Sequence, residues 1–299
     1  MEAAKEFSSL NQAVATVFGE HLHIVSKQPV FGGDINQSYC LSLSNGTEVF
    51  IKCNRLENLS FFRAEAAGLQ AIRQTGTIRV PQVFGIGIDE TRQISFLLLE
   101  YLKAAPKIDT YWETFGRELA MLHQASVSAD REQRFGFWMD NYIGASVQVN
   151  TPRQSWIAFF RECRLLPQIR MAKGYLDSRM QKQCISLLEH LDSYLTEPEF
   201  PSLLHGDLWS GNAVCGPDGK AWILDPAAYI GHFEADLAMT ELFGGFTEAF
   251  YKAYDEVNPI DAGYRERKDL YHLYHLLNHL NLFGGSYWNS VRQILNRYV

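Results

Sequence analysis

The pattern of apolar residues changes near residues 102–107, and this change most restricts how the chain can fold. Before it, short runs rich in β-branched and aromatic residues, such as 94–102, alternate with turn residues. After it, apolar residues recur at helical spacing, as in 110–125. The pattern predicts an α+β chain with a small antiparallel β-rich N-terminal lobe, residues 1–102, and a larger, mainly helical C-terminal lobe, residues 103–299.

The N-terminal lobe is predicted to contain strands around a single helix. The Asn-Gly pair at 45–46 separates two β-rich runs, which is typical of a tight hairpin. The stretch 60–76 has apolar residues on one helical face and ends in a glycine, a common helix terminator. In the strand around Lys52, alternation places this side chain on the face opposite Ile51 and Cys53.

Charge and cysteine usage exclude several classes of protein. The net charge is -7 and no basic tract stands out, which argues against binding to nucleic acid or to an anionic membrane. Five cysteines without a CxxC pair fit a reducing compartment. The N-terminal stretch lacks a signal-peptide pattern, and no apolar run is long enough to span a bilayer. We therefore expect a cytoplasmic protein.

Polar side chains gather in and just after the segment LLHGDLWSGN, residues 203–212. Asp207 and Asn212 lie within it, and Asp225 ends a strand-like run downstream. The hairpin predicted between Asn212 and Asp225 would return both to one end, where an amide and a carboxylate oxygen suit Mg²⁺. Asp207 would then accept or orient the proton of a substrate hydroxyl. Asp207 alone could equally be an ordinary turn residue.

Phosphoryl transfer also needs a cover for the phosphates and a cation that contacts them. Backbone N–H groups of the segment GGDINQS could cradle phosphates, although a plain turn explains this segment more simply. The residues concerned are Gly32, Gly33, Asp34, Ile35 and Asn36. A pair of Lys52 with Glu65, from the following helix, would hold the ammonium toward the phosphates, and two surface charges are the alternative. The chain thus has candidates for each part of an ATP- and Mg²⁺-dependent kinase.

The loop together with ILDPAAYIGHFEADLAM resembles the fructosamine kinase (ketosamine-3-kinase) family, which is similar in fold to aminoglycoside and choline kinases and, more distantly, to protein kinases. The segments FIKC, FLLLEYL, ELAMLHQ, FGFWMDNYIG and LYHLLNHLNLFGG also resemble family segments, in family order, across nearly the whole chain. The resemblance implies a two-lobed protein-kinase-like fold. It implies Asp207 as the catalytic aspartate, Asn212 and Asp225 as Mg²⁺ ligands, and Lys52 with Glu65 as the ion pair that orients the phosphates.

The same resemblance implies further roles. Glu100, Tyr101 and Leu102 would form the connector that presents backbone groups to adenine. Gly206 stands where protein kinases have an arginine, and this departure favours a kinase of small molecules.

Candidates for substrate binding are less sharply defined by the sequence. Trp209 could stack on a sugar or simply pack within the loop. His232 and Glu234 could face the substrate or only brace their turn. In the resembling family the segment with His279 and Asn281 lies near the substrate cleft, which makes both residues candidates for sugar binding.

The sequence therefore predicts a kinase that phosphorylates a sugar hydroxyl, the 3-hydroxyl of a free or protein-linked ketosamine, in deglycation or sugar-amine metabolism. An aminoglycoside- or choline-type kinase is the alternative within the same class. Such enzymes bind cations and tend to line the cleft with acids, and no acidic cluster beyond Glu234 and Asp236 follows the loop. A catalytically silent pseudokinase that binds nucleotide or sugar is the alternative from another class, and metal-dependent ATP turnover would separate the two.

Overall fold

The computed structural model describes residues 4–30, 36–125 and 134–299. The chain divides into two compact units, of which the first is Met1–Tyr111 with Ala213–Pro226 and the second is Trp112–Asn212 with Ala227–Val299. The boundary predicted at residue 102 falls inside the first unit. The predicted hairpin after Asn212 also belongs to this unit, so the chain returns to it after building much of the second.

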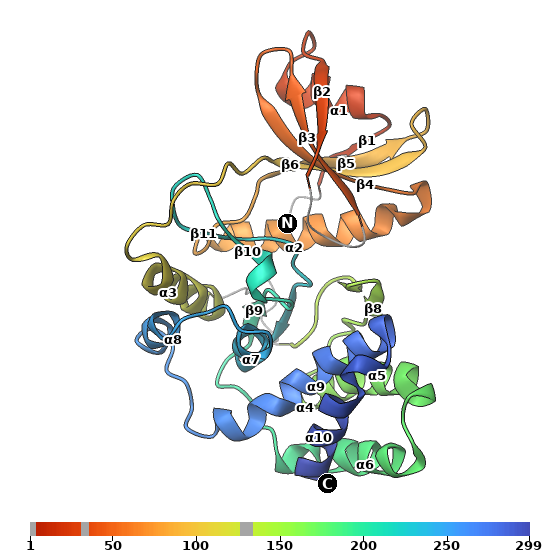
Figure 1. Ribbon diagram of the computed structural model, residues 1–299, viewed down its shortest axis with the longest axis vertical. Helices are drawn as coiled ribbons and strands as arrows, with labels where there is room; N and C mark the ends of the chain where they lie inside the picture. The colour runs from red at the N-terminus through yellow and green to blue at the C-terminus, as the bar shows by residue number, and fades with distance from the viewer. Residues whose placement is uncertain (1–3, 31–35, 126–133) are drawn as a thin grey trace. The chain divides into compact units, whose positions relative to one another are not determined.

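The first unit is built on a six-stranded sheet, confirming the predicted β-rich N-terminal part (Figure 1). Across the sheet the strands are β1 (Glu6–Phe7), β5 (Val83–Asp89), β6 (Ile94–Glu100), β4 (Glu48–Asn54), β3 (Gln37–Leu43) and β2 (Ile24–Pro29). Neighbours are antiparallel, except that β1 pairs parallel with β5. The unit also contains helices α1 (Leu10–Phe18) and α2 (Leu59–Thr75), and the hairpin of β10 (Ala213–Cys215) and β11 (Ala221–Ile223).

Helix α1 is a correction to the prediction of a single helix in this part of the chain. The Ser9 side chain caps it by accepting a hydrogen bond of 3.1 Å from the Gln12 N–H. Leu10 and Val14 are buried in a core cluster that also contains Ile51 and Cys53 of β4. Lys52 points to the other face and contacts Glu65 of α2, so the predicted alternation along β4 is confirmed.

Two glycines end elements where the sequence predicted. Gly46, in the turn between β3 and β4, has φ of +85°, and Gly76 caps α2 with φ of +64°. Both lie in the left-handed region, which a residue without Cβ adopts at little cost.

The second unit is mainly helical, as predicted (Figure 1). Its helices are α3 (Tyr111–Gln124, beginning at the boundary), α4 (Trp156–Phe159), a π-helix (Phe160–Leu165), α5 (Leu166–Met171), α6 (Ser178–Glu189), α7 (Glu234–Leu242), α8 (Glu248–Asp255), α9 (Tyr264–Phe283) and α10 (Trp288–Tyr298). Two short antiparallel pairs join them, β7 (Asn141–Ile143) with β8 (Ser146–Gln148) and β9 (Ser202–Leu204) with β12 (Tyr229–Gly231).

Close packing fixes the helices of the second unit against one another. At Gly116 of α3 an added Cβ would lie 2.2 Å from the Phe250 carbonyl of α8, so only glycine permits this approach. Trp156 is fully buried among aromatic side chains that include Phe160 and Tyr271. Among the residues that the structure describes, no helix combines the length and apolarity that crossing a bilayer requires.

Candidate active site

Lys52 forms the centre of a buried ion cluster in the first unit. Its Nζ donates to Oε1 of Glu65 at 2.8 Å and also to Oδ1 of Asp225. Burial by itself would lower the pKa of Lys52, but the charges of Asp225 and Glu65 outweigh burial and raise it. The ammonium therefore stays charged at neutral pH. The Lys52–Glu65 contact was expected from the sequence, whereas the contact with Asp225 was not.

Asp225 has an unusual backbone conformation. Its φ is +55°, and within the described residues only Gln93 shares a positive φ among non-glycine residues. Asp and Asn adopt this region more readily than other side chains, which explains the residue type. The hairpin before it pairs Ala213, which follows Asn212, with Ile223. Although one oxygen contacts Lys52, the Asp225 side chain is 45% exposed and can take further partners.

In the second unit, Asn212 braces Asp207. Its Nδ2 donates to the Asp207 carbonyl at 2.9 Å and to the carboxylate Oδ2 at 3.3 Å. Because the amide nitrogen faces Asp207, the Asn212 amide oxygen is the atom that could accept a hydrogen bond or bind a cation. Asp207 itself is half-buried. The structure thus joins two of the residues that the sequence singled out.

Asp236 of α7 holds the start of loop 205–212. It accepts hydrogen bonds from the backbone N–H of His205 at 2.6 Å and of Gly206 at 2.8 Å, and so supports the loop backbone. Its other contact is Nε2 of His123 at 3.2 Å, and Nδ1 of His123 lies 2.7 Å from the Tyr254 hydroxyl. Sequence reasoning did not identify His123 or Tyr254, which looked like ordinary members of amphipathic helices.

The indole ring of Trp209 packs on the backbone of Gly211, two residues further along the loop. A Cβ at Gly211 would come within 2.2 Å of the indole ring, so the ring rests on the glycine backbone. The residue is nonetheless 40% exposed. Its ring is therefore held in position by Gly211 and still presents surface to solvent.

Of the other predicted nucleotide contacts, those that the structure describes lie in or beside the sheet. Gly32, Gly33, Asp34 and Ile35 lie outside the described residues. Asn36 is described, and its Oδ1 accepts a hydrogen bond of 2.7 Å from Asn54 Nδ2. The predicted connector begins at the end of β6, where the Glu100 N–H donates to the Gln82 carbonyl at 2.9 Å. Tyr101 and Leu102 follow this strand and are half-buried.

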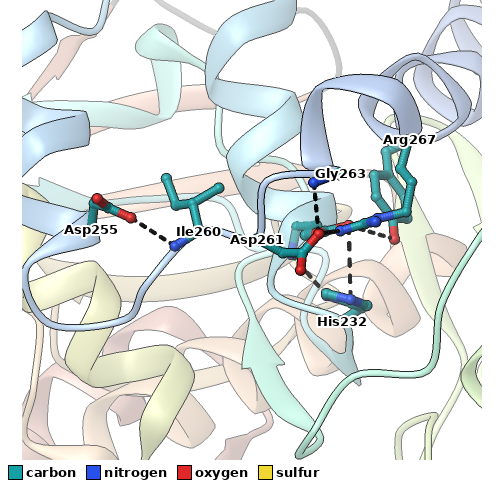
Figure 2. Close-up of polar contacts among 8 residues, drawn as sticks. His232, Asp255, Ile260, Asp261, Gly263 and Arg267 are labelled. Carbon is teal, nitrogen blue, oxygen red and sulfur yellow. Dashed lines mark hydrogen bonds and ion pairs between the residues drawn. The ribbon is translucent and has the colours of Figure 1, made fainter.

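Glu234 is placed differently from the position expected of a substrate ligand. It has no exposed surface, and its carboxylate accepts from Nε of Arg267 at 3.0 Å and from Nη2 at 2.6 Å. Tyr271 donates a further hydrogen bond of 3.2 Å. Arg267 also contacts Asp261, to which its Nη2 donates a hydrogen bond of 2.8 Å (Figure 2). The Asp261 carboxylate accepts a second hydrogen bond from the Gly263 N–H. These contacts favour bracing of α7 over binding of an amine.

His232 lies beside this ion cluster and is also buried (Figure 2). Burial lowers its pKa to about 4, so the imidazole is neutral at physiological pH. Its ring packs against Trp156 and Phe233, and Nε2 lies 3.8 Å from Glu234. Of the two roles that the sequence left open for His232, the structure favours support of the turn.

Removing Arg267 should destabilise the second unit strongly. We expect Arg267→Ala to lower the free energy of unfolding by roughly 3–5 kcal/mol, because it leaves the buried Glu234 carboxylate without its cation. Urea denaturation followed by circular dichroism measures the loss. Arg117→Ala is the matched control, because Arg117 makes an ion pair of 2.7 Å with Glu256 at the exposed surface, close to the 2.6 Å of the buried pair. The control should lose no more than about 1 kcal/mol, and equal losses in both variants would contradict the assignment.

His279 and Asn281 occupy the C-terminal half of α9. His279 stacks on Phe283 and Tyr287 and meets the edge of Phe243, and burial lowers its pKa. Asn281 donates through Nδ2 to the carbonyl of Gln168 at 3.1 Å and to its Oε1 at 2.8 Å. The amide nitrogen of Asn281 is thus engaged within the unit.

The side chains of Asn212 and of Asp225, each within its own unit, offer donor atoms of the kind that magnesium prefers. One is an amide oxygen and the other a carboxylate that remains 45% exposed. Mg²⁺ prefers such hard oxygen ligands and keeps several waters, so two protein ligands are sufficient. No sulfur or imidazole competes in this pair, which argues against a softer metal.

Comparison with known proteins finds relatives that match nearly the whole chain. The family model described as fructosamine kinase matches residues 6–299. A probable ketoamine kinase of Synechocystis sp. is 40% identical over 97% of this chain and 96% of its own. A chloroplastic protein-ribulosamine 3-kinase of Arabidopsis thaliana is 39% identical over 94% of this chain and 85% of its own.

Solved structures confirm the fold. A candidate fructosamine-3-kinase from Haemophilus somnus gives a TM-score of 0.85 at 32% identity, covering 97% of this chain and 96% of that one. A choline kinase from Streptococcus pneumoniae, at 13% identity and a TM-score of 0.59 over 96% of each chain, shares the fold alone. The protein-kinase-like α+β fold expected from the sequence is therefore confirmed. On the match over residues 6–299 and these relatives, the chain belongs to the fructosamine kinase family.

Proposed function

We propose that this chain transfers the γ-phosphoryl group of ATP to the 3-hydroxyl of a ketosamine. Membership of the fructosamine kinase family makes it a ketosamine kinase, a phosphotransferase with an alcohol group as acceptor. The observation that carries the proposed chemistry is the buried Lys52 ammonium, held by Glu65 and Asp225. Burying a cation with two carboxylates carries a desolvation penalty, so such a cluster contributes little to stability. A lysine that must contact the phosphates of a nucleotide accounts for its presence.

The chemical step needs little from the protein beyond position and charge. The hydroxyl oxygen of the substrate forms a bond to the γ-phosphorus while the bond to the ADP oxygen breaks and ADP leaves with the electron pair. In the proposed roles, Asp207 accepts or orients the hydroxyl proton, and Lys52 neutralises charge on the phosphates. Backbone groups around Glu100, Tyr101 and Leu102 contact the adenine.

The proposed metal ligands are Asn212 and Asp225. When bound, Mg²⁺ supplies positive charge that offsets the charge developing on the transferring phosphoryl group. Asn212 is already fixed by its hydrogen bonds to Asp207, so the amide oxygen needs no rearrangement of the loop to act as a ligand. Asp225 would share its carboxylate between Lys52 and the ion.

Trp209 is the residue that we assign to the sugar. Its ring is held by Gly211 and 40% exposed, which suits contact with the apolar C–H face of a sugar. His279 remains a candidate within its aromatic cluster. We leave Glu234 and His232 out of the substrate site because both are buried and already bonded or packed.

The proposed specificity predicts discrimination against the parent ketose. A site that hydrogen-bonds the substituted amine leaves buried polar groups unmatched when fructose binds instead. We expect fructosamine to exceed fructose at least about tenfold in kcat/KM, since an unmatched buried polar group costs about 1–3 kcal/mol. Competition kinetics with N-α-blocked fructoselysine and fructose, under saturating ATP, measures the ratio.

Two further acceptors in the same assay test the alternatives. Equal specificity constants for the two sugars, or a clear preference for choline or kanamycin, would contradict the ketosamine assignment. Absence of Mg²⁺-dependent ATP turnover with every acceptor would indicate a pseudokinase.

A further inference from the structure

A buried polar network in the second unit lies behind loop 205–212 and is not used by the roles proposed above. Its members come from the β7–β8 hairpin, the chain after it, the π-helix and α9. None is more than 3% exposed, and they are Asn141, Gln148, Asn150, Arg164 and Tyr274. A polar group buried this deeply destabilises the fold unless it is hydrogen-bonded, so the arrangement of partners matters.

Arg164 sets the direction of every hydrogen bond in this network. A guanidinium can only donate, and its Nη2 donates to Asn150 Oδ1 at 2.7 Å. The amide of Asn150 must therefore present its nitrogen on the other side, where Nδ2 donates to Asn141 Oδ1 at 2.9 Å. The guanidinium itself is fixed, because Nη1 donates to the Val149 carbonyl at 2.6 Å and the group lies 3.9 Å from the ring centre of Tyr229.

The network ends on two consecutive backbone carbonyls. With its oxygen accepting from Asn150, Asn141 donates through Nδ2 to the Ala228 carbonyl at 2.7 Å. Gln148 donates through Nε2 to Asn141 Oδ1 at 2.7 Å and to the Ala227 carbonyl at 3.0 Å. The Tyr274 hydroxyl donates to Gln148 Oε1 at 2.7 Å and holds that amide in place. The carbonyls of Ala227 and Ala228 thus receive a defined pair of donors.

The Ala227 carbonyl in turn borders loop 205–212. A Cβ on Gly206 would lie 2.2 Å from this oxygen, so the two backbones are in direct contact there. Gly206 has φ of +81°, and its N–H donates to Asp236. The backbone immediately before Asp207 is therefore confined between Asp236 on one side and Ala227 on the other.

From these contacts we infer that Gln148 is a positioning residue for Asp207, acting through the Ala227 carbonyl with its amide oriented by Tyr274. The inference rests on the proposed catalytic role of Asp207. Gln148 touches no reacting group in this scheme. It fixes the carbonyl against which Gly206 packs, and so fixes the direction in which the next residue presents its carboxylate. A displacement of about 1 Å at a reacting group can cost roughly 10²-fold in rate, so this support should be visible in turnover.

The test compares Gln148→Met with Gln183→Met. Methionine keeps the length of glutamine but cannot donate to Ala227. Gln183 is the matched control, because it is a 93% buried glutamine of α6 whose amide donates to Asn296 and Val299 of the C-terminal segment. We expect Gln148→Met to lower kcat roughly 10- to 100-fold with the KM for ATP within about twofold of wild type. We expect Gln183→Met to keep kcat near wild type at temperatures well below both melting points.

A second pair of variants covers the case in which Gln148→Met fails to fold. Tyr274→Phe removes only the hydroxyl that orients Gln148, and we expect kcat to fall about two- to tenfold, the net effect of one hydrogen bond. Tyr264→Phe is its control, because Tyr264 is also a buried tyrosine of α9 and its hydroxyl donates to Glu241 at 2.6 Å, outside the network. Equal kcat values within each pair would overturn the inference.

Asp207→Asn is measured in the same series, so that failure of the inference and failure of the proposed site give different results. An inactive Asp207→Asn with Gln148 and Tyr274 variants that match their controls would refute the positioning role alone. An active Asp207→Asn would refute the proposed site on which the inference rests.

Discussion

Asp207→Asn is expected to lower kcat by roughly 10²- to 10⁴-fold, the range for a positioned acid–base group. The asparagine amide can keep the hydrogen-bonding geometry of the loop but cannot accept the hydroxyl proton as a carboxylate does. Binding of ATP should change little, because Asp207 is assigned to the acceptor hydroxyl. Steady-state turnover with fructoselysine and calorimetric titration with a non-hydrolysable ATP analogue measure the two effects separately.

A conservative change elsewhere controls for this variant. Asp192 is an exposed aspartate of the second unit, and Asp192→Asn should leave both turnover and nucleotide affinity at wild-type values. Turnover of Asp207→Asn close to that of Asp192→Asn would show that Asp207 has no role in the chemical step.

Asp225→Asn should mainly change the dependence on Mg²⁺. Asparagine tolerates the positive φ at this position, so the backbone should be preserved while one negative charge is lost. We expect the Mg²⁺ concentration for half-maximal activity to rise at least about tenfold, and excess Mg²⁺ to restore part of the rate. Titration of activity with Mg²⁺ at fixed ATP is the measurement.

Glu65→Gln is the appropriate comparison for Asp225→Asn. Both variants remove one carboxylate partner from Lys52, but only Asp225 is a proposed metal ligand. The Glu65 variant should lose turnover without a shift in the Mg²⁺ midpoint. A similar shift in both variants would mean that Asp225 acts through Lys52 and does not bind the ion.

Local pattern was sufficient to predict much of the first unit. Alternation along β4 separated Lys52 from Ile51 and Cys53, and the structure confirms both faces. The missed helix α1 is only nine residues long, and its stability comes from packing of Leu10 and Val14 on the sheet. Short helices are marginal in isolation, so their sequence signal is weak.

Long-range contacts account for what the sequence could not show at the site. Lys52 and Asp225 are 173 positions apart, and no local pattern indicates that they meet. Glu234 could not be recognised as a bracing residue, because its cation, Arg267, lies 33 residues further along the chain. Gln148 carried no signal at all, since a glutamine in a short polar hairpin is usually exposed. The burial of these side chains and the identity of their hydrogen-bond and ion-pair partners are set only when the whole chain has folded.

The discontinuity of the first unit has a consequence for the order in which the protein is made. The Arg79 carbonyl accepts a hydrogen bond of 3.0 Å from the Ile223 N–H. The Arg79 side chain forms an ion pair with Asp218, with Nε lying 2.5 Å from the carboxylate. These partners leave the ribosome only after the whole of residues 112–212, a delay on the order of ten seconds at common elongation rates. If the sheet forms before residue 213 has been made, it forms without this hairpin, and a fragment ending at residue 111 would lack the hairpin permanently.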